Sequence, residues 1–310
     1  MIISASRRTD IPAFYSDWFI KRMQEGFVLV RNPMNPHQVS SVSLKREDVD
    51  CIVFWTKNPE DMLPKLDRLD GYPFYFQFTL NPYGQELEPG VPRKAQVIDI
   101  FKRLSDRIGK ERVIWRYDPI ILNNTMDISW HEQYFDVLAG SLFGYTTKCI
   151  ISFVDYYRKL DKTFKAIGIA ELYDNQKQEL AAGFSAMARK YGLKLETCAE
   201  EIDLSDMGIG HARCIDPELI QKLTGVKLKD EKDNNQRKLC GCAPSVDIGM
   251  YDTCRHGCIY CYANHSKASA KRNAAAGNVD SPLLCSELTE EDRLTERKSS
   301  MNRNMLEASR

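Results

Sequence analysis

Short apolar runs alternate with amphipathic stretches from the start of the chain to about residue 225. Seven runs have the length and the β-branched or aromatic content of buried strands: MIISAS, FVLV, CIVFW, FYFQFTL, RVIWRY, KCIISFV and LKLETC. A weaker eighth run is GIGHARC. Stretches with helical spacing lie between them at residues 17–24, 59–69, 93–108, 130–142 and 172–191, and Ser129 is a candidate N-cap for the fourth. Strands that alternate with helices predict βαβ units around a parallel sheet.

Polar and charged residues follow most of these runs, at the point where each strand should end. The segments are RRTD (7–10), RNP (31–33), TKNP (56–59), NPYG (81–84), RYDP (116–119), VDYYRK (154–159) and CAEE (198–201). In a (β/α) barrel the carboxyl ends of all strands face one mouth, where the active site is built. We therefore expect an α/β fold of the (β/α) TIM-type barrel, closed or partial, with a doubly wound open sheet as the alternative.

The chain changes character after residue 225. Residues 226–238 are polar and rich in Asn and Lys, which is typical of a linker, and an extended linker of this length can return to the barrel mouth. Residues 240–264 are rich in cysteine, whereas residues 265–310 contain no aromatic residue. The sequence predicts a barrel with its linker over 1–239, a cysteine-rich cluster-binding segment over 240–264, and a polar, loosely ordered tail with one short helix at most over 265–310.

Composition limits the class of protein. Of the 310 residues 43% are hydrophobic, enough for a substantial core, and 43 Lys and Arg balance 43 Asp and Glu. A neutral chain has no global basic field that would draw it to nucleic acid or anionic lipid. The beginning, MIISASRRTDIP, does not resemble a signal peptide, and no stretch has about 18 uninterrupted apolar residues. We therefore expect a cytoplasmic protein without a membrane span.

The ten cysteines point to metal chemistry. A reducing cytoplasm keeps thiols free, so clustered thiols there are better interpreted as metal ligands or catalytic groups than as disulfides. Cys254, Cys258 and Cys261 are spaced CxxxCxxC, with Tyr260 before the third. Three thiolates can hold three irons of a [4Fe-4S] cluster and leave the fourth iron open, whereas an electron-transfer cluster normally has four protein ligands. The spacing therefore predicts chemistry at the open iron.

The stretch CRHGCIYCYAN, with an aromatic residue before its last cysteine, resembles the signature loop of the radical S-adenosylmethionine (SAM) enzymes. The chain from SRRTDIP through FWTKNP, RYDPI and CAEEIDL to DIGMYDTCRHGCIYCYAN also resembles a bacterial family of unknown function whose members carry a radical SAM-like cluster at the C-terminus. The superfamily uses full or partial (β/α) barrels, in agreement with the alternating pattern. Its cysteine loop usually follows the first barrel strand, whereas here the loop follows the last.

The resemblance implies an enzyme that holds a [4Fe-4S] cluster on Cys254, Cys258 and Cys261 and binds SAM at the open iron. Reductive cleavage of SAM would then give a 5′-deoxyadenosyl radical that abstracts a hydrogen from a substrate. A one-electron donor such as a flavodoxin or ferredoxin is implied, and the substrate stays open between a small molecule, a peptide and a nucleotide. The strand-end residues that are candidates to contact SAM or substrate are Lys57, Asn81, Arg116, Asp118, Asp155 and Arg158.

Four more cysteines could meet at the mouth. Cys198 and Cys214 lie near the ends of the last two predicted strands, and Cys240 and Cys242 stand together in LCGCAP. Four thiolates would complete an auxiliary iron–sulfur cluster or a tetrahedral zinc site, and the CxC spacing slightly favours iron–sulfur. The remaining three cysteines are interpreted as small buried hydrophobes: Cys51, Cys149 and Cys285.

The main alternative is a zinc-stabilised binding module. In this interpretation seven cysteines, with His256 or His265, fill two zinc sites, and the basic stretch KASAKR contacts nucleic acid. The module would leave a large barrel without a role, and the basic stretch is short in a neutral chain. A ferredoxin-like electron carrier is a weaker alternative because of the size of the chain and the missing fourth ligand.

Overall fold

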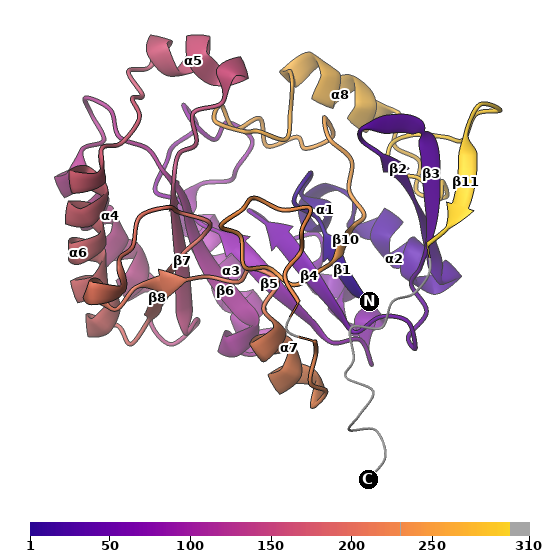
Figure 1. Cartoon of the computed structure of the whole chain (residues 1–310), viewed down its shortest axis with the longest axis horizontal. Helices are drawn as coiled ribbons and strands as arrows, with labels where there is room; N and C mark the ends of the chain where they lie inside the picture. The colour runs from indigo at the N-terminus through magenta and orange to yellow at the C-terminus, as the bar shows by residue number, and fades with distance from the viewer. Residues whose placement is uncertain (230, 298–310) are drawn as a thin grey trace.

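The computed structural model describes residues 1–229 and 231–297, and its main feature is a parallel sheet of eight strands (Figure 1). In spatial order the strands are β10 (Val246–Asp247), β1 (Ile2–Ala5), β4 (Cys51–Thr56), β5 (Phe74–Thr79), β6 (Val113–Ile120), β7 (Lys148–Phe153), β8 (Lys194–Thr197) and β9 (Gly210–His211). The predicted α/β fold with a parallel sheet is confirmed. Within the described residues the edge strands β10 and β9 do not pair, so the sheet is open and not the closed form of the predicted barrel.

Helices connect these strands. The α-helices are α1 (Ile11–Phe14), α2 (Ser16–Glu25), α3 (Lys94–Ile108), α4 (Ile128–Ser141), α5 (Asp161–Ala166), α6 (Asp174–Lys190), α7 (Pro217–Thr224) and α8 (Lys267–Ala275). Short 3₁₀ helices are η1 (Leu63–Leu69), η2 (Lys110–Arg112), η3 (Arg158–Leu160) and η4 (Ser205–Met207). Consecutive strands from β4 to β9 are neighbours in space, as expected for short crossover connections.

Local sequence explains how these helices begin. Asp127, and not the predicted Ser129, caps α4, because its Oδ1 accepts the Trp130 amide at 2.8 Å. The stretch at 59–69 forms η1 at Leu63–Leu69 and no α-helix. Pro64 removes a backbone donor that an α-helix over this stretch would use.

The run FVLV does not join the parallel sheet, contrary to prediction. It belongs to β2 (Phe27–Asn32), which pairs antiparallel with β3 (Asn35–Ser43). Only two residues separate these strands, and so short a connection permits a hairpin but not a parallel crossover. β11 (Arg293–Glu296) adds to β3 and completes a separate three-stranded sheet.

The two faces of the parallel sheet are covered differently. Alternate residues such as Ile3, Phe54 and Trp115 enter the main core under the helices, where Phe135 and Phe184 stack with ring centroids 4.1 Å apart. The other face presents a second set that includes Ile2, Val53, Tyr75, Ile114 and Ile150. This set packs against α7 and against residues on either side of it, among them Ala212, Leu228 and Ala243. The returning chain therefore fills the space that a closed barrel would fill with its own interior side chains.

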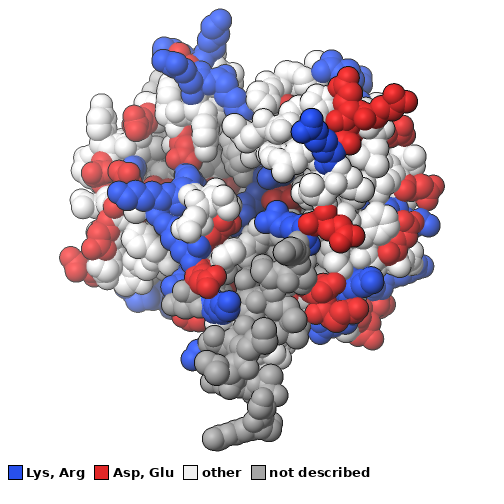
Figure 2. All heavy atoms as spheres, turned by 45° about the vertical axis from the view of Figure 1, so that its right-hand side comes forward, with Lys and Arg blue, Asp and Glu red and all other residues white. Residues whose placement is uncertain are grey.

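Residues after the cysteine-rich segment contain helix α8 and strand β11, and Leu283, Leu284 and Cys285 are buried. The part of the predicted loose tail at 298–310 lies outside the described residues. None of the helices within 1–229 and 231–297 has the length and apolar character needed to cross a membrane. Figure 2 shows Lys and Arg side chains interspersed with Asp and Glu on one face, as the balanced composition suggests.

Candidate functional site

A large cavity lies at the carboxyl ends of the parallel strands. Its volume is about 940 Å³, and small-molecule sites span roughly 300–1,000 Å³. The strand-end residues that line it include Asp10 after β1, Lys57 after β4, Arg116 and Asp118 in β6, and Asp155 after β7. The polar residues at the predicted strand ends thus converge on one site, because parallel strands end at the same edge of the sheet.

The cysteine loop, residues 250–264, forms one wall of this cavity. Cys254, Cys258 and Cys261 all line the cavity, and each is partly buried. Gly257 has φ +66°, a conformation that glycine adopts without strain. The Cys261 amide donates to the Cys258 carbonyl at 3.2 Å, and the Ala263 amide donates to the Cys261 sulfur at 3.3 Å. The CxxxCxxC segment therefore folds into turns, and all three of its cysteines line the same cavity.

Strand β10 brings the cysteine loop to the cavity. Its residue Asp247 accepts hydrogen bonds from the Ser4 hydroxyl at 2.7 Å, the Ser6 hydroxyl at 2.5 Å and the Arg7 amide at 2.8 Å. A loop that follows the last strand thus starts beside the end of the first strand. The two-residue β10 lacks a periodic pattern, so the sequence did not predict it.

The far side of the cysteine loop docks on the segment after β5. The Gly90 amide donates to the His256 carbonyl at 2.8 Å, and the Ile259 amide donates to the Leu87 carbonyl at 3.0 Å. A Cβ atom at position 90 would lie 2.7 Å from the carbonyl oxygens of Arg255 and His256. Only glycine permits this approach of two backbones, so the loop is positioned by main-chain contacts as well as by side chains.

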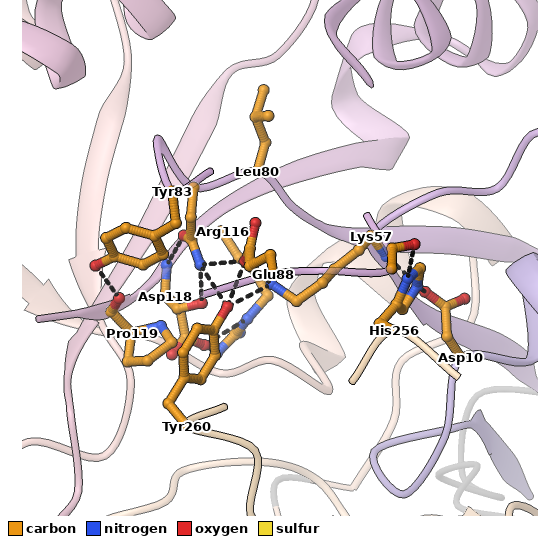
Figure 3. A network of polar contacts seen from close by, with 12 residues as sticks. Asp10, Lys57, Leu80, Tyr83, Glu88, Arg116, Asp118, Pro119, His256 and Tyr260 are labelled. Atoms are coloured by element: carbon orange, nitrogen blue, oxygen red, sulfur yellow. Dashed lines mark hydrogen bonds and ion pairs between the residues drawn. The ribbon is translucent and has the colours of Figure 1, made fainter. Parts of the chain in front are cut away.

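Asp10 and His256 form a second anchor (Figure 3). His256 Nε2 lies 2.8 Å from Asp10 Oδ2, and both side chains are buried. Asp10 also accepts the Lys57 amide at 2.7 Å and caps α1 through the Ala13 amide at 3.0 Å. His256 Nδ1 lies 3.2 Å from the Gly90 carbonyl. Because both ring nitrogens have protein partners, His256 braces the loop here and is not placed as the zinc ligand of the alternative interpretation.

A buried carboxylate, Glu88, ties the cysteine loop to two cations (Figure 3). Its oxygens lie 2.7 Å from Lys57 Nζ and 2.6 Å from Lys94 Nζ, and the Tyr260 hydroxyl also donates to it. Burial disfavours the carboxylate, but the two ammonium groups outweigh it and lower the pKa of Glu88 to about 2. Burial likewise opposes the charge on Lys57, yet Glu88 raises the pKa of Lys57. The ion cluster thus holds Tyr260, the residue before the third cysteine.

Arg116 and Asp118 pair with each other in β6. Arg116 Nε donates to Asp118 at 3.0 Å, and the Ser152 hydroxyl donates to the other carboxylate oxygen. Burial opposes the charged carboxylate, but the guanidinium outweighs it and lowers the pKa of Asp118. Arg116 Nη1 donates to the Cys214 sulfur at 2.8 Å. Arg116 therefore connects the cavity wall to the second group of cysteines.

The other three predicted contact residues have different surroundings. Asn81 is fully buried behind the cavity wall, where it donates to the Asp118 carbonyl and accepts the Asp118 amide, both at 2.8 Å. Asp155 lines the cavity and pairs with Arg237 at 2.6 Å. Arg158 is exposed on η3 and does not line the cavity. The structure thus brings Lys57, Asp155 and the Arg116–Asp118 pair together at the cavity, with Asn81 as a support behind them.

Sequence reasoning missed Glu88 and Asp247. Both lie outside the predicted strand ends, in the stretches QELEPG and SVDIG. Each is an acidic residue between two apolar ones, a pattern that is also common on surfaces, so the sequence alone gave no reason to select them.

The donor set of the cysteine loop fits an iron–sulfur cluster. Burial raises the pKa of Cys254 and raises that of Cys258 to about 12, so these thiols need the positive charge of a metal centre to deprotonate. Across the described ranges, no group of three or more His, Cys, Asp or Glu side chains is placed to hold a metal ion. A four-iron cube is larger than an ion and spaces its thiolates more widely. The three cysteines of the motif line one cavity, as a cluster with three protein ligands and one open iron would require.

The remaining cysteines fall into two groups. Cys198, Cys214, Cys240 and Cys242 also line the cavity. Cys51, Cys149 and Cys285 are buried, and none of them lines it.

The family model described as a domain of unknown function (DUF1848) matches residues 2–263. The matched span contains the whole parallel sheet, every described residue that lines the cavity except Arg297, and all three cysteines of the CxxxCxxC motif. A comparison with curated proteins and one with solved structures each found no match.

Proposed function

The chain belongs to the family described as a domain of unknown function (DUF1848), and for this protein we propose a radical SAM activity. In this proposal Cys254, Cys258 and Cys261 hold a [4Fe-4S] cluster, SAM binds at the open iron, and a substrate occupies the same cavity. The observation that carries it is the convergence of three thiols, all from one eight-residue stretch, on the cavity at the strand ends. Three protein ligands leave one iron for a small molecule.

The chain's own residues position the cluster and keep water from it. The cluster, when bound, supplies the electron that cleaves SAM to methionine and a 5′-deoxyadenosyl radical. Gly90, Asp10 and Glu88 hold the cysteine loop from three directions. Lys159 donates to the carbonyls of Tyr262 and Asn264, so the segment around η3 covers the outer side of the loop. These contacts restrict the access of water and oxidants to the reacting atoms.

The cavity offers several groups to SAM and substrate. Its volume of about 940 Å³ leaves room for a small substrate beside SAM. Asp118 and Asp155 are positioned to accept from amino or hydroxyl groups. The rings of Tyr157 and Tyr262, with centroids 6.1 Å apart, offer an aromatic surface for a base.

The basic side chains among the predicted contact residues have a different role from Asp118 and Asp155. Lys57 and Arg116 are held by Glu88 and Asp118, so they act mainly by fixing their neighbours. The one-electron donor in this proposal is of the flavodoxin or ferredoxin type.

The direct test is product formation. Protein reconstituted anaerobically with iron and sulfide, reduced with dithionite and incubated with SAM is expected to release 5′-deoxyadenosine and methionine in equal amounts. An aliquot left unreduced is the control and is expected to release neither. Absence of 5′-deoxyadenosine from reduced protein that contains four irons and four sulfides per cluster would contradict the proposal.

A further inference from the structure

Four cysteines outside the CxxxCxxC motif meet although they come from three separate parts of the chain. Cys198 follows β8, Cys214 lies between β9 and α7, and Cys240 and Cys242 lie in the connection from α7 to β10. The sulfur atoms of Cys198 and Cys214 are 3.4 Å apart. The Cys242 sulfur accepts the amide of Ile215, the residue after Cys214, at 3.4 Å, and Cys240 is two residues before Cys242. The four cysteines thus lie together at one wall of the cavity, and we call them the four-cysteine group.

The group differs from ordinary buried cysteines of this chain. Cys51 and Cys149 lie in apolar strands, and the one hydrogen bond that the described residues give the Cys51 thiol goes to the carbonyl of the next residue, at 3.7 Å. Cys198 and Cys240, by contrast, are half-buried, and all four members of the group line the cavity. Packing alone therefore explains Cys51 and Cys149, but it gives no reason for four thiols to gather at a cavity wall.

One arginine donates to the four-cysteine group, and a second lies near it. Arg116 Nη1 donates to the Cys214 sulfur at 2.8 Å while the same guanidinium pairs with Asp118. Arg7 lies within electrostatic reach of Cys242, Cys214 and Cys240. Its Nη2 atom is buried and has no hydrogen-bond partner in the described part of the chain. Donors of this kind stabilise metal-bound thiolates, because four thiolates around a metal centre carry net negative charge.

The four-cysteine group also lies where a metal centre would stabilise the fold. The described residues of the connection from α7 to β10 form no helix or named strand, yet several of them pack on the inner face of the sheet. It is held there by the Ala243 amide, which donates to the Ile215 carbonyl at 3.1 Å, and by the Asp233 amide, which donates to the Cys242 carbonyl at 2.9 Å. A metal centre shared by Cys198, Cys214 and the Cys240–Cys242 pair would tie this connection to the ends of β8 and β9.

We propose that Cys198, Cys214, Cys240 and Cys242 form a second metal site, which binds a thiophilic centre through four thiolates. Binding releases the four thiol protons to solvent and replaces the sulfur–sulfur contacts by metal–sulfur bonds. Both an iron–sulfur cluster and a zinc ion have this chemistry. The inference stands on the four-cysteine group alone and does not rest on SAM chemistry.

The test is the metal content of a variant. The double variant C240A/C242A, purified anaerobically, is expected to lose either two to four irons with the matching sulfide or about one zinc per chain. Loss of iron and sulfide assigns a cluster, and loss of zinc assigns an ion. The matched control C51A/C149A removes two buried thiols away from the cavity and is expected to keep the wild-type content. Unchanged iron, sulfide and zinc in C240A/C242A would overturn the proposal.

A second variant tests the proposed metal site even if C240A/C242A does not fold. The triple variant C254A/C258A/C261A removes the cysteine-loop site and leaves the four-cysteine group intact. It is expected to retain one metal centre, as iron with sulfide or as zinc. A triple variant that contains neither would overturn the second site. A failure of the proposed SAM activity leaves this result unaffected, so the two proposals fail separately.

Discussion

Replacement of Cys254, Cys258 and Cys261 by alanine is expected to abolish the release of 5′-deoxyadenosine from SAM. The three cysteines of the loop all line the cavity, and their loss removes every protein ligand of the proposed cluster. The fold is expected to persist, because the loop is also held by Gly90, His256 and Tyr260, which remain. Iron and sulfide should fall by one four-iron cluster per chain, and circular dichroism should match the wild type.

The control for this result is C51A/C149A, which removes thiols buried in β4 and β7. It is expected to retain the iron and the product formation of the wild type. A triple variant that still forms 5′-deoxyadenosine at the wild-type rate would refute the assignment of these cysteines.

Replacement of Glu88 by glutamine is expected to lower the thermal stability of the protein markedly. Glu88 is the carboxylate between Lys57 and Lys94 and accepts the Tyr260 hydroxyl, and its side chain is 1% exposed. Glutamine keeps the shape but leaves two partly buried ammonium groups without their anion. We expect a loss of about 2–4 kcal/mol, which corresponds to a fall in Tm of roughly 4–8 °C. Differential scanning calorimetry measures this change.

The loss of stability in E88Q is also expected to depend on pH. The folded protein lowers the pKa of Glu88 from 4.5 to about 2. The carboxylate therefore contributes its stabilisation above about pH 4.5, and this contribution is lost as the pH falls towards 2. The Tm difference between wild type and E88Q should be largest near neutral pH and shrink on acidification. E86Q, at an exposed position two residues away, is the matched control. A Tm difference independent of pH, or equal in E86Q, would contradict the role given to Glu88.

Much of the sheet could be predicted because its strands are apolar runs that are buried on both faces. Six of the seven strong runs, and the weak eighth at Gly210–His211, belong to the parallel sheet. The run FVLV was assigned to the wrong sheet, because its composition is that of a buried strand and only the two-residue turn before Asn35 reveals the hairpin. β10 could not be found, since its position depends on Asp247 and its partners in β1.

In the candidate site, too, some residues could be predicted from the sequence and others could not. Strand-end residues such as Lys57, Arg116 and Asp118 could be located because parallel topology sends all strand ends to one edge. The residues that pair with Lys57 and Arg116 could not be located from the sequence. Glu88 and Cys214 lie on loops, and the paths of these loops depend on tertiary contacts. The sequence also does not indicate that a segment after α7 fills the inner face of the sheet and leaves it open. That filling depends on packing between Leu228, Ala243 and the strands, which no local pattern specifies.

The most direct test of the central claim, an iron open to SAM, is electron paramagnetic resonance on the anaerobically reconstituted, dithionite-reduced protein with and without SAM. We predict a reduced-cluster signal that accounts for the iron bound by the cysteine loop and that changes in g values and shape when SAM is added. The triple variant C254A/C258A/C261A should lack the SAM-sensitive signal. A reduced-cluster signal that SAM does not change, or a protein that binds zinc and gives no iron signal, would contradict the claim.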